Sequence, residues 1–128
     1  MRVMVFGTFD DLHPGHRHFL ARAEAFGVLS IVVARDQNVR RIKGRSPQFA
    51  EKERMAVIQE AFPKAEVLLG HPTDFLHWIH ERKPGLLLLG YDQKLPPGIQ
   101  PEDLNTEVRR LSAFEPEKWK SSLRRKQR

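Results

Sequence analysis

The sequence predicts a single α/β domain, a Rossmann-like doubly wound parallel sheet flanked by helices. Four short apolar runs carry this prediction: residues 3–6, 29–34, 67–69 and 86–89. None of them alternates with polar residues, which is typical of parallel strands that are buried on both faces. Segments with helical spacing separate the runs, and this alternation favours right-handed crossovers. With 128 residues, the chain fits one domain with one core.

Three segments between the strands have the apolar spacing of helices. Residues 15–26 place apolar side chains on one stripe, and residues 47–62 do the same. Ser46 is a candidate N-cap for the second helix, because proline follows at the first helical position. Residues 74–82 form a shorter helix, with Asp74 as a candidate cap.

The C-terminal third is less regular. Residues 101–111 are expected to form one more helix, and residues 111–114 fit a short edge strand. In such sheets, ligands bind at the carboxyl ends of the strands, near the point at which the strand order reverses. The loops to search are therefore 7–14, 35–46, 70–74 and 90–100.

Composition excludes several classes of protein. The chain has no cysteine, so disulfides and thiolate metal sites are ruled out, which fits a reducing cytoplasm. No apolar run approaches 18 residues, and the first residues enter a strand directly, so we expect neither a membrane span nor a signal peptide. The net charge of +6 comes from residues 118–128, which hold six basic residues and no acidic one. Because the rest of the chain is neutral, a nucleic-acid-binding face is not expected.

The stretch GTFDDLHPGH, residues 7–16, has the features of a phosphate cradle. Gly15 leaves the N-terminus of the first helix uncovered, so an anion can approach its free N–H groups. His13 and His16 lie three positions apart across that terminus and can direct ring N–H groups at the same anion. Thr8 adds a hydroxyl from the strand end. Such donors suit a phosphate whose charge rises during a reaction.

Other interpretations of these histidines remain open. Together with His18, the pair His13 and His16 could ligate a metal, or they could be ordinary cap or surface residues. The dinucleotide fingerprint GxGxxG and the P-loop GxxxxGK[ST] are both absent, so those two phosphate-binding classes lose support.

This stretch resembles the signature of the cytidylyltransferase-like nucleotidyltransferases, whose HxGH element is HPGH here. The residues on motif positions are Gly7, Thr8, Phe9, Asp10, His13, Gly15 and His16. Residues 34–47 are similar to the family's second loop, with Lys43 and Arg45. LGYDQ, residues 89–93, is similar to its fourth-strand motif, with Asp92. KSSL, residues 120–123, looks like a reduced Ser/Thr-rich element, with Ser121 and Ser122.

The resemblance implies an enzyme that transfers a nucleoside monophosphate from ATP or CTP to a phosphorylated acceptor and releases pyrophosphate. No covalent intermediate is expected, so the protein positions the reactants and stabilises charge. His13, His16 and Lys43 are the implied catalytic residues, and Lys43 and Arg45 the implied acceptor-phosphate ligands. The implied nucleotide ligands are Gly7, Thr8, Phe9, Asp10, Gly15, Asp92, Ser121 and Ser122, although Asp10 suits a role in loop geometry. The resemblance also implies that Mg²⁺ arrives with the substrate phosphates. It further implies a homodimer.

Two substrate assignments compete within this resemblance. Residues 32–47 and LGYDQ are similar to archaeal-type FAD synthetases, which transfer AMP from ATP to FMN, and this is the assignment we favour. The alternative is a cytidylyltransferase for glycerol 3-phosphate or another phospho-alcohol. In those enzymes an arginine leads the Ser/Thr element, whereas Glu115 stands near that place here. An alternative from another class is a nucleotide-binding module without turnover, and a third is nucleic-acid binding through the basic tail.

Overall fold

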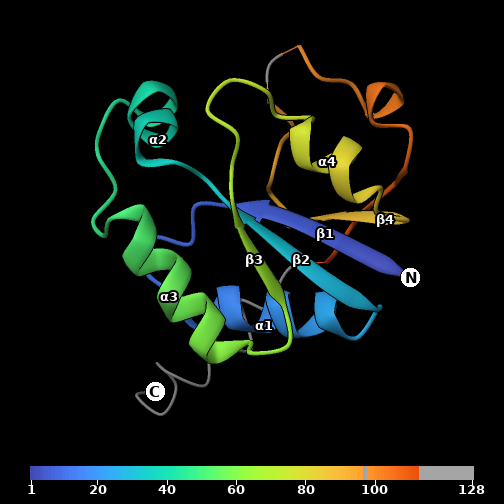
Figure 1. Cartoon of the computed structure of the whole chain (residues 1–128), viewed down its shortest axis with the longest axis horizontal. Coiled ribbons are helices and arrows are strands. Elements are labelled where there is room, and N and C mark those ends of the chain that lie inside the picture. The colour runs from blue at the N-terminus through green and yellow to red at the C-terminus, as the bar shows by residue number, and fades with distance from the viewer. Residues whose placement is uncertain (97, 113–128) are drawn as a thin grey trace, which may run out of the picture.

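Five strands form one sheet in the order β3-β2-β1-β4-β5 in the computed structural model of the chain (Figure 1). The structure describes residues 1–96 and 98–112. The strands are β1 (Arg2–Gly7), β2 (Val28–Val33), β3 (Glu66–Leu69), β4 (Leu86–Leu89) and β5 (Glu107–Arg110). The helices are α1 (Pro14–Glu24), α2 (Asp36–Lys43), α3 (Glu51–Ala61), α4 (His77–Arg82) and the 3₁₀ helix η1 (Pro101–Leu104). All neighbouring strands run parallel, which confirms the predicted fold class.

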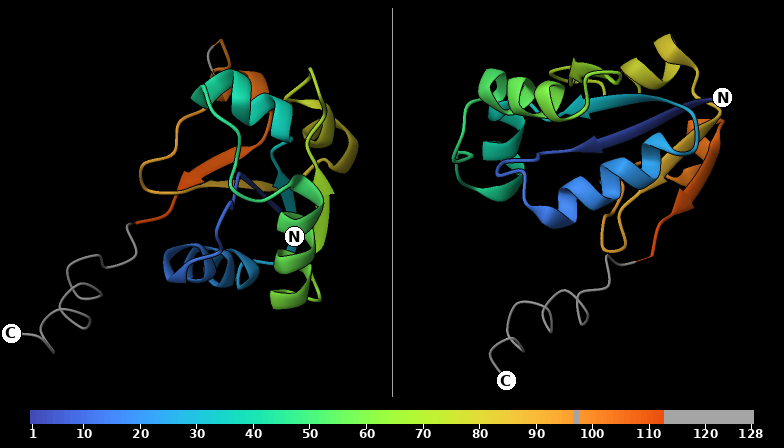
Figure 2. Two further views of the ribbon diagram at one scale, coloured as in Figure 1. Left: turned by 90° about the vertical axis from the view of Figure 1, so that its left-hand side faces the viewer. Right: turned by 90° about the horizontal axis from the view of Figure 1, so that it is seen from below.

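Helices cover both faces of the sheet, and an apolar cluster fills the space on each side. α1 and α3 pack on one face, where Leu20 and Ile58 meet the odd-numbered side chains of β1 (Figure 2). α4 and η1 pack on the opposite face, where Ile79 and Leu104 contact Met4 of β1. The central strands are therefore buried on both sides, as their unbroken apolar sequences indicate.

The order of the strands reverses beside β1. The chain runs outward from β1 through β2 to β3, and then returns to place β4 on the other side of β1. The carboxyl ends of β1 and β4 therefore diverge into different connections and leave a crevice, which is where ligands bind in such sheets. Among the residues that the structure describes, no helix is both long and apolar enough to cross a membrane.

The region between β2 and α3 differs from expectation. Residues 35–46 were expected as a loop, but they contain the eight-residue helix α2, which ends at Gly44 in a left-handed conformation (φ 76°). The next helix begins at Glu51 with Ala50 as its N-cap, so the prediction of Ser46 as the cap was wrong. Tertiary hydrogen bonds explain the later start, because the backbone N–H groups of Gln48 and Phe49 donate to Asp10 and not within a helix.

The C-terminal helix prediction was also wrong. Residues 101–111 form the short helix η1 and then β5, because Asn105 adopts a left-handed conformation (φ 52°) that ends the helix. Strand β5 pairs in parallel with β4, so Glu107 lies opposite Leu86. The predicted edge strand at 111–114 extends beyond the described residues.

Candidate active site

The loop after β1 turns sharply and leads the chain to the N-terminus of α1. Phe9 has a left-handed backbone (φ 49°), and only 6% of it is exposed. A Cβ atom on Gly7 would lie 2.6 Å from the Phe9 ring, so a larger residue at position 7 forces this ring to move. Gly7 and Phe9 together fix the path by which the HPGH segment leaves the sheet.

His13 is the N-cap of α1. Its Nδ1 accepts hydrogen bonds from the backbone N–H groups of Gly15 (3.1 Å) and His16 (3.3 Å). A nitrogen that accepts carries no proton, so the proton of the neutral ring lies on Nε2. A Cβ on Gly15 would lie 2.9 Å from Cε1 of His13, so glycine permits this close contact. His13 can therefore donate from Nε2. The expectation of free N–H groups at this helix N-terminus was wrong, because the N–H groups of Gly15 and His16 donate to His13 itself.

The ring of His16 stacks on His13, with centroids 3.6 Å apart and planes inclined by 19°. Its Nδ1 lies 3.2 Å from the backbone carbonyl oxygen of Asp11, so in the neutral ring Nδ1–H donates to this oxygen and Nε2 is an acceptor. Burial lowers the pKa of His16, the neighbouring charge of His13 lowers it further, and the Asp11 carbonyl opposes both. His16 is thus neutral near pH 7 and becomes an Nε2 donor once it is protonated.

Asp10 shapes the loop with its carboxylate. Its oxygens accept hydrogen bonds from the backbone N–H groups of Gln48 (2.6 Å) and Phe49 (2.8 Å). Burial raises the pKa of Asp10, but these two hydrogen bonds and the charges of Arg54 and Lys43 hold it below its ordinary value. The carboxylate is therefore committed to the protein and ties the β1 loop to the segment before α3.

Arg54 of α3 is a functional candidate that sequence reasoning missed. It is only 2% exposed. Its guanidinium donates to the backbone oxygens of Thr8 (2.8 Å) and Phe49 (3.0 Å), and to the carboxylate of Asp36 (2.6 Å). An arginine in an amphipathic helix is ordinarily a surface residue, so the sequence gives no signal of this buried role.

A cavity of about 660 Å³ opens at the carboxyl ends of the strands, next to the HPGH loop. It is bounded by α2, the ends of β1 and β2, and the loops that follow β3 and β4. This volume is within the range of pockets that hold cofactor-sized ligands. Gly7 and Thr8 belong both to the cavity wall and to the loop that carries His13 and His16, so the cavity and the histidine cradle adjoin at these residues.

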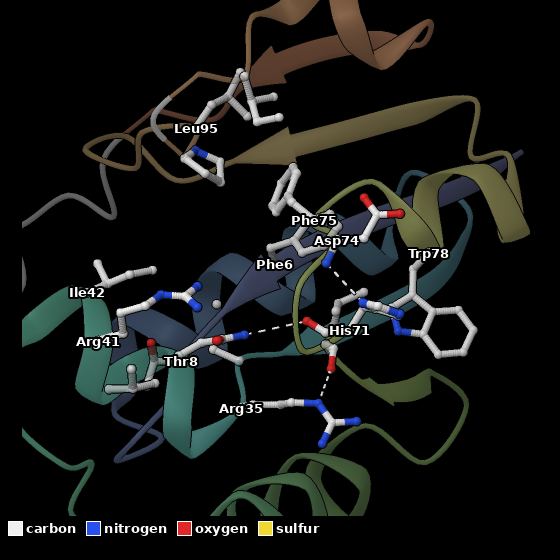
Figure 3. Close-up of a pocket in the computed structure, with 18 of the residues that line it drawn as sticks. Phe6, Thr8, Arg35, Arg41, Ile42, His71, Asp74, Phe75, Trp78 and Leu95 are labelled. Carbon is white, nitrogen blue, oxygen red and sulfur yellow. Dashed lines mark hydrogen bonds between the residues drawn. The ribbon is translucent and has the colours of Figure 1, made fainter.

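The two ends of the cavity differ in chemistry (Figure 3). The aromatic end is formed by Phe6 and Phe75, whose ring centroids are 4.5 Å apart, while Trp78 and Leu95 line other parts of the wall on opposite sides of these rings (Figure 3). The other end is formed by Thr8 and by residues of α2 that include Arg41 and Lys43. The cavity therefore suits a molecule with a flat apolar part and an anionic part.

The predicted site residues are distributed unequally around this cavity. Gly7, Thr8 and Lys43 line it, whereas Arg45 is exposed and does not. The charge of Lys43 contributes to lowering the pKa of both Asp10 and His16. Ser121 and Ser122 lie outside the described residues, as does the whole basic tail.

Asp92 lies in the exposed loop after β4, outside the cavity wall. Gln93 anchors this loop to β1, because its side-chain amide donates to the Phe6 carbonyl oxygen (2.8 Å) and accepts from the backbone N–H of Gly90 (3.0 Å). Arg110 of β5 also donates to the carbonyl oxygens of Gly90 (2.8 Å) and Gln93. The LGYDQ segment is thus held rigidly beside the crevice between β1 and β4.

His71 and Asn38 also line the cavity, and they lie in segments 70–74 and 35–46, where the sequence predicted that ligands bind, although neither was named as a site residue. His71 Nδ1 accepts the backbone N–H groups of Thr73 (3.1 Å) and Asp74 (2.9 Å), and its ring lies 4.7 Å from that of His77. Asn38 Oδ1 is buried and has no hydrogen-bond partner among residues 1–96 and 98–112. These residues come from a loop and a helix far apart in sequence, so no local pattern shows that they share one cavity.

The described residues offer no prepared metal cage. Within ranges 1–96 and 98–112, no group of three or more His, Asp or Glu side chains is placed to hold a metal ion. The Nδ1 atoms of His13 and His16 are engaged with backbone groups, and both oxygens of Asp10 accept from amides.

Comparison with known proteins places the chain among nucleotide-processing enzymes. Residues 4–125 match the family described as cytidylyltransferase-like. The FAD synthase of Methanothermobacter thermautotrophicus is 39% identical over 121 residues, which are 88% of this chain and 80% of that protein. The FAD synthase of Thermoplasma acidophilum is 35% identical and is aligned over 98% of this chain and 92% of its own length.

A solved structure has the same fold. The crystal structure from Thermoplasma volcanium described as a lipopolysaccharide core biosynthesis protein superimposes with a TM-score of 0.81 at 36% identity. The alignment covers 90% of this chain and 98% of that chain.

Proposed function

The chain belongs to the cytidylyltransferase-like nucleotidyltransferases, and from this premise we propose that it transfers AMP from ATP to FMN, forming FAD and pyrophosphate. FAD synthases are similar to it over most of its length, and their name supports this choice of nucleotide and acceptor. The structural support is the cavity, which has aromatic and cationic residues in its wall and adjoins the histidine cradle at Gly7 and Thr8.

The cavity is the observation that supports FMN as the acceptor. FMN combines a flat tricyclic ring with a phosphate at the end of a flexible chain. The walls formed by Phe6, Phe75 and Leu95 suit the ring, and the end near Thr8 and Lys43 suits the phosphate. Glycerol 3-phosphate has no apolar ring to occupy the aromatic end. The cavity therefore favours the flavin over the phospho-alcohols that the resemblance also allows.

The proposed reaction is an in-line displacement. A phosphate oxygen of FMN forms a bond to the α-phosphorus of ATP, while the bond from this phosphorus to the bridging oxygen breaks and its electrons leave with pyrophosphate. His13 donates from Nε2 to the nucleotide phosphates, and His16 donates once it is protonated. Lys43, on the cavity wall, holds the two phosphate groups together against their mutual repulsion. No side chain forms a covalent intermediate.

Magnesium remains part of the proposal as an ion that arrives with the nucleotide. Mg²⁺ prefers oxygen ligands and retains waters, so phosphate oxygens can supply its principal contacts. The fully engaged Asp10 carboxylate fits this view, because it is not available as a ligand without loss of two backbone hydrogen bonds. A homodimer and a cytoplasmic location complete the proposal, and light scattering tests the dimer.

The deciding experiment measures products with ATP or CTP and with FMN or glycerol 3-phosphate in all four combinations, with Mg²⁺ present. We expect FAD and pyrophosphate only from ATP with FMN. CDP-glycerol from CTP would assign the phospho-alcohol reaction instead. Nucleotide binding without any product would indicate a binding module. The Arg109→Gln variant, which is altered only in an exposed ion pair, is prepared in parallel as a control for preparation and folding.

A further inference from the structure

Arg41 is one of four cationic residues in the cavity wall, with Arg35, Lys43 and Lys94, and neither the resemblance nor the sequence pattern identifies it. It extends from α2 toward the middle of the cavity, on the side of Thr8 (Figure 3). Across the described ranges, Arg41 takes part in no side-chain hydrogen bond or ion pair. A guanidinium that faces a ligand-sized cavity without a protein partner is able to bind an anionic ligand.

We propose that Arg41 binds the phosphate of the acceptor and so makes the enzyme select the phosphorylated flavin over the same flavin without its phosphate. This inference rests on the proposed function, because it assumes that a flavin occupies the cavity. In this inference, Arg41 of α2 selects the phosphorylated flavin, and the histidine cradle does not.

The geometry of the guanidinium suits this task. Arginine presents planar pairs of N–H donors that match two oxygens of one phosphate, whereas lysine presents a single charged point. Arg41 and Asn38 are three residues apart on α2, so they lie on the same face of the helix. Both line the cavity. The acceptor phosphate would then lie between Arg41 on α2 and Thr8 on the β1 loop, next to the cradle that holds the nucleotide.

A simpler role for Arg41 has to be separated from this one. Arg40, Arg41 and Lys43 occupy the last turn of α2, where positive charge interacts favourably with the helix dipole. Arg40 shares this environment but does not line the cavity. Substitution of Arg40 is therefore a matched control for substitution of Arg41. Each substitution removes one positive charge from the same end of α2, but only the change at Arg41 alters the cavity wall.

The test compares Arg41→Gln with Arg40→Gln in the full chain. Dissociation constants for FMN and for riboflavin are measured by flavin fluorescence, and that for ATP by calorimetry. We expect Arg41→Gln to weaken FMN binding by about ten- to a hundredfold, as for loss of a charged hydrogen-bonded pair. Riboflavin binding should stay within about twofold of the wild type, as should both flavins with Arg40→Gln. Arg41→Lys should recover part of the FMN affinity.

Several outcomes would overturn the inference. Equal losses of FMN and riboflavin affinity would mean that Arg41 contacts the ring or supports the wall. A loss of ATP affinity alone would assign Arg41 to the nucleotide. An equal effect of Arg40→Gln would reduce the role to general charge. If the wild type binds FMN and Arg41→Gln binds it equally well, only this inference fails. If the wild type binds neither flavin, the proposed function fails with it.

Discussion

Arg54 and Asp36 form an ion pair of 2.6 Å in which the arginine side chain is completely shielded from solvent. The same guanidinium also holds the carbonyl oxygen of Thr8. Asp36 in turn accepts from the backbone N–H of Glu51, whose carboxylate accepts from the backbone N–H of Asp36. One buried cation thus connects the loop of the histidine cradle, the start of α2 and the start of α3.

The first prediction concerns this pair. Asp36→Asn leaves the buried guanidinium without a counter-charge, so we expect the free energy of unfolding to fall by about 3–5 kcal/mol. Glu107→Gln is the matched change in the exposed pair with Arg109, and it should cost less than about 1 kcal/mol. Urea unfolding measures both values. Similar losses in the two variants would show that burial of Arg54 is energetically unimportant.

The second prediction concerns the turn after β1. Gly7→Ala places a Cβ 2.6 Å from the ring of the buried Phe9, so the ring must shift. We expect a loss of about 1–3 kcal/mol in the free energy of unfolding, as for overpacking a core. Gly90→Ala is the control, because its added Cβ would have no neighbour closer than 3.8 Å. Unchanged stability of Gly7→Ala in urea would mean that the loop adapts without strain.

The sequence allowed the sheet and the start of α1 to be predicted, because both depend on local patterns. Unbroken apolar runs identify β1 to β4, and HPGH after the first strand identifies the N-terminus of α1. Strand β5 lacks such a run, since of its four residues only Val108 packs into a core cluster, with the others exposed. The position of β5 depends on its pairing with β4, and the local sequence of β5 does not predict this pairing.

Helix α2 and the aromatic wall of the cavity were not predictable for related reasons, although the loops expected to hold a ligand do line the cavity. Only Val39 of α2 is buried, so the helix has almost no apolar stripe, and its N-terminus depends on the contact between Asp36 and Arg54. The aromatic wall joins Phe6 at the end of β1 to Phe75 in the loop before α4. Only the folded sheet brings these two rings together.

The third prediction concerns catalysis by His16. His16→Ala removes a donor from the phosphate cradle, so we expect turnover to fall by roughly two to four orders of magnitude. The fold should survive, because the cap of α1 is provided by His13. His80→Ala is the control, on the exposed part of α4. Steady-state formation of FAD is the measurement, and full turnover of a folded His16→Ala protein would remove this residue from the mechanism.

The fourth prediction concerns the proton that His16 needs. Burial and His13 hold the pKa of His16 below its ordinary value, so the free protein carries it neutral at pH 7. A bound triphosphate favours the charged form and raises this pKa, so binding should take up a proton. The affinity for ATP should therefore increase as pH falls from about 8 toward 6.

Calorimetry in buffers of different ionisation enthalpy measures this uptake directly. The nucleotide's own phosphates also titrate, so the informative quantity is the difference between the wild type and His16→Gln. We expect the variant to take up less than the wild type by up to one proton per bound nucleotide. The same depressed pKa means that the contribution of His16 to folding stability is complete above its ordinary pKa and is lost as pH falls toward the lowered value. Identical proton uptake by both proteins would place the titrating group elsewhere.

The fifth prediction concerns the aromatic end of the cavity. Phe75 contacts Phe6 at 4.5 Å and lines the cavity, so Phe75→Ala removes part of the surface against which a flavin ring would pack. We expect KM for FMN to increase by roughly tenfold, in keeping with about 1 kcal/mol or more for one aromatic contact, while KM for ATP stays unchanged. Phe26→Ala is a poor control because it packs against the core, so the better comparison is Tyr91→Ala, an exposed aromatic residue outside the cavity wall. Equal effects on ATP and FMN would show that Phe75 supports the whole crevice. An effect on FMN alone would assign the aromatic end of the cavity to the acceptor, because Phe75 lines the cavity and does not belong to the loop that carries His13 and His16.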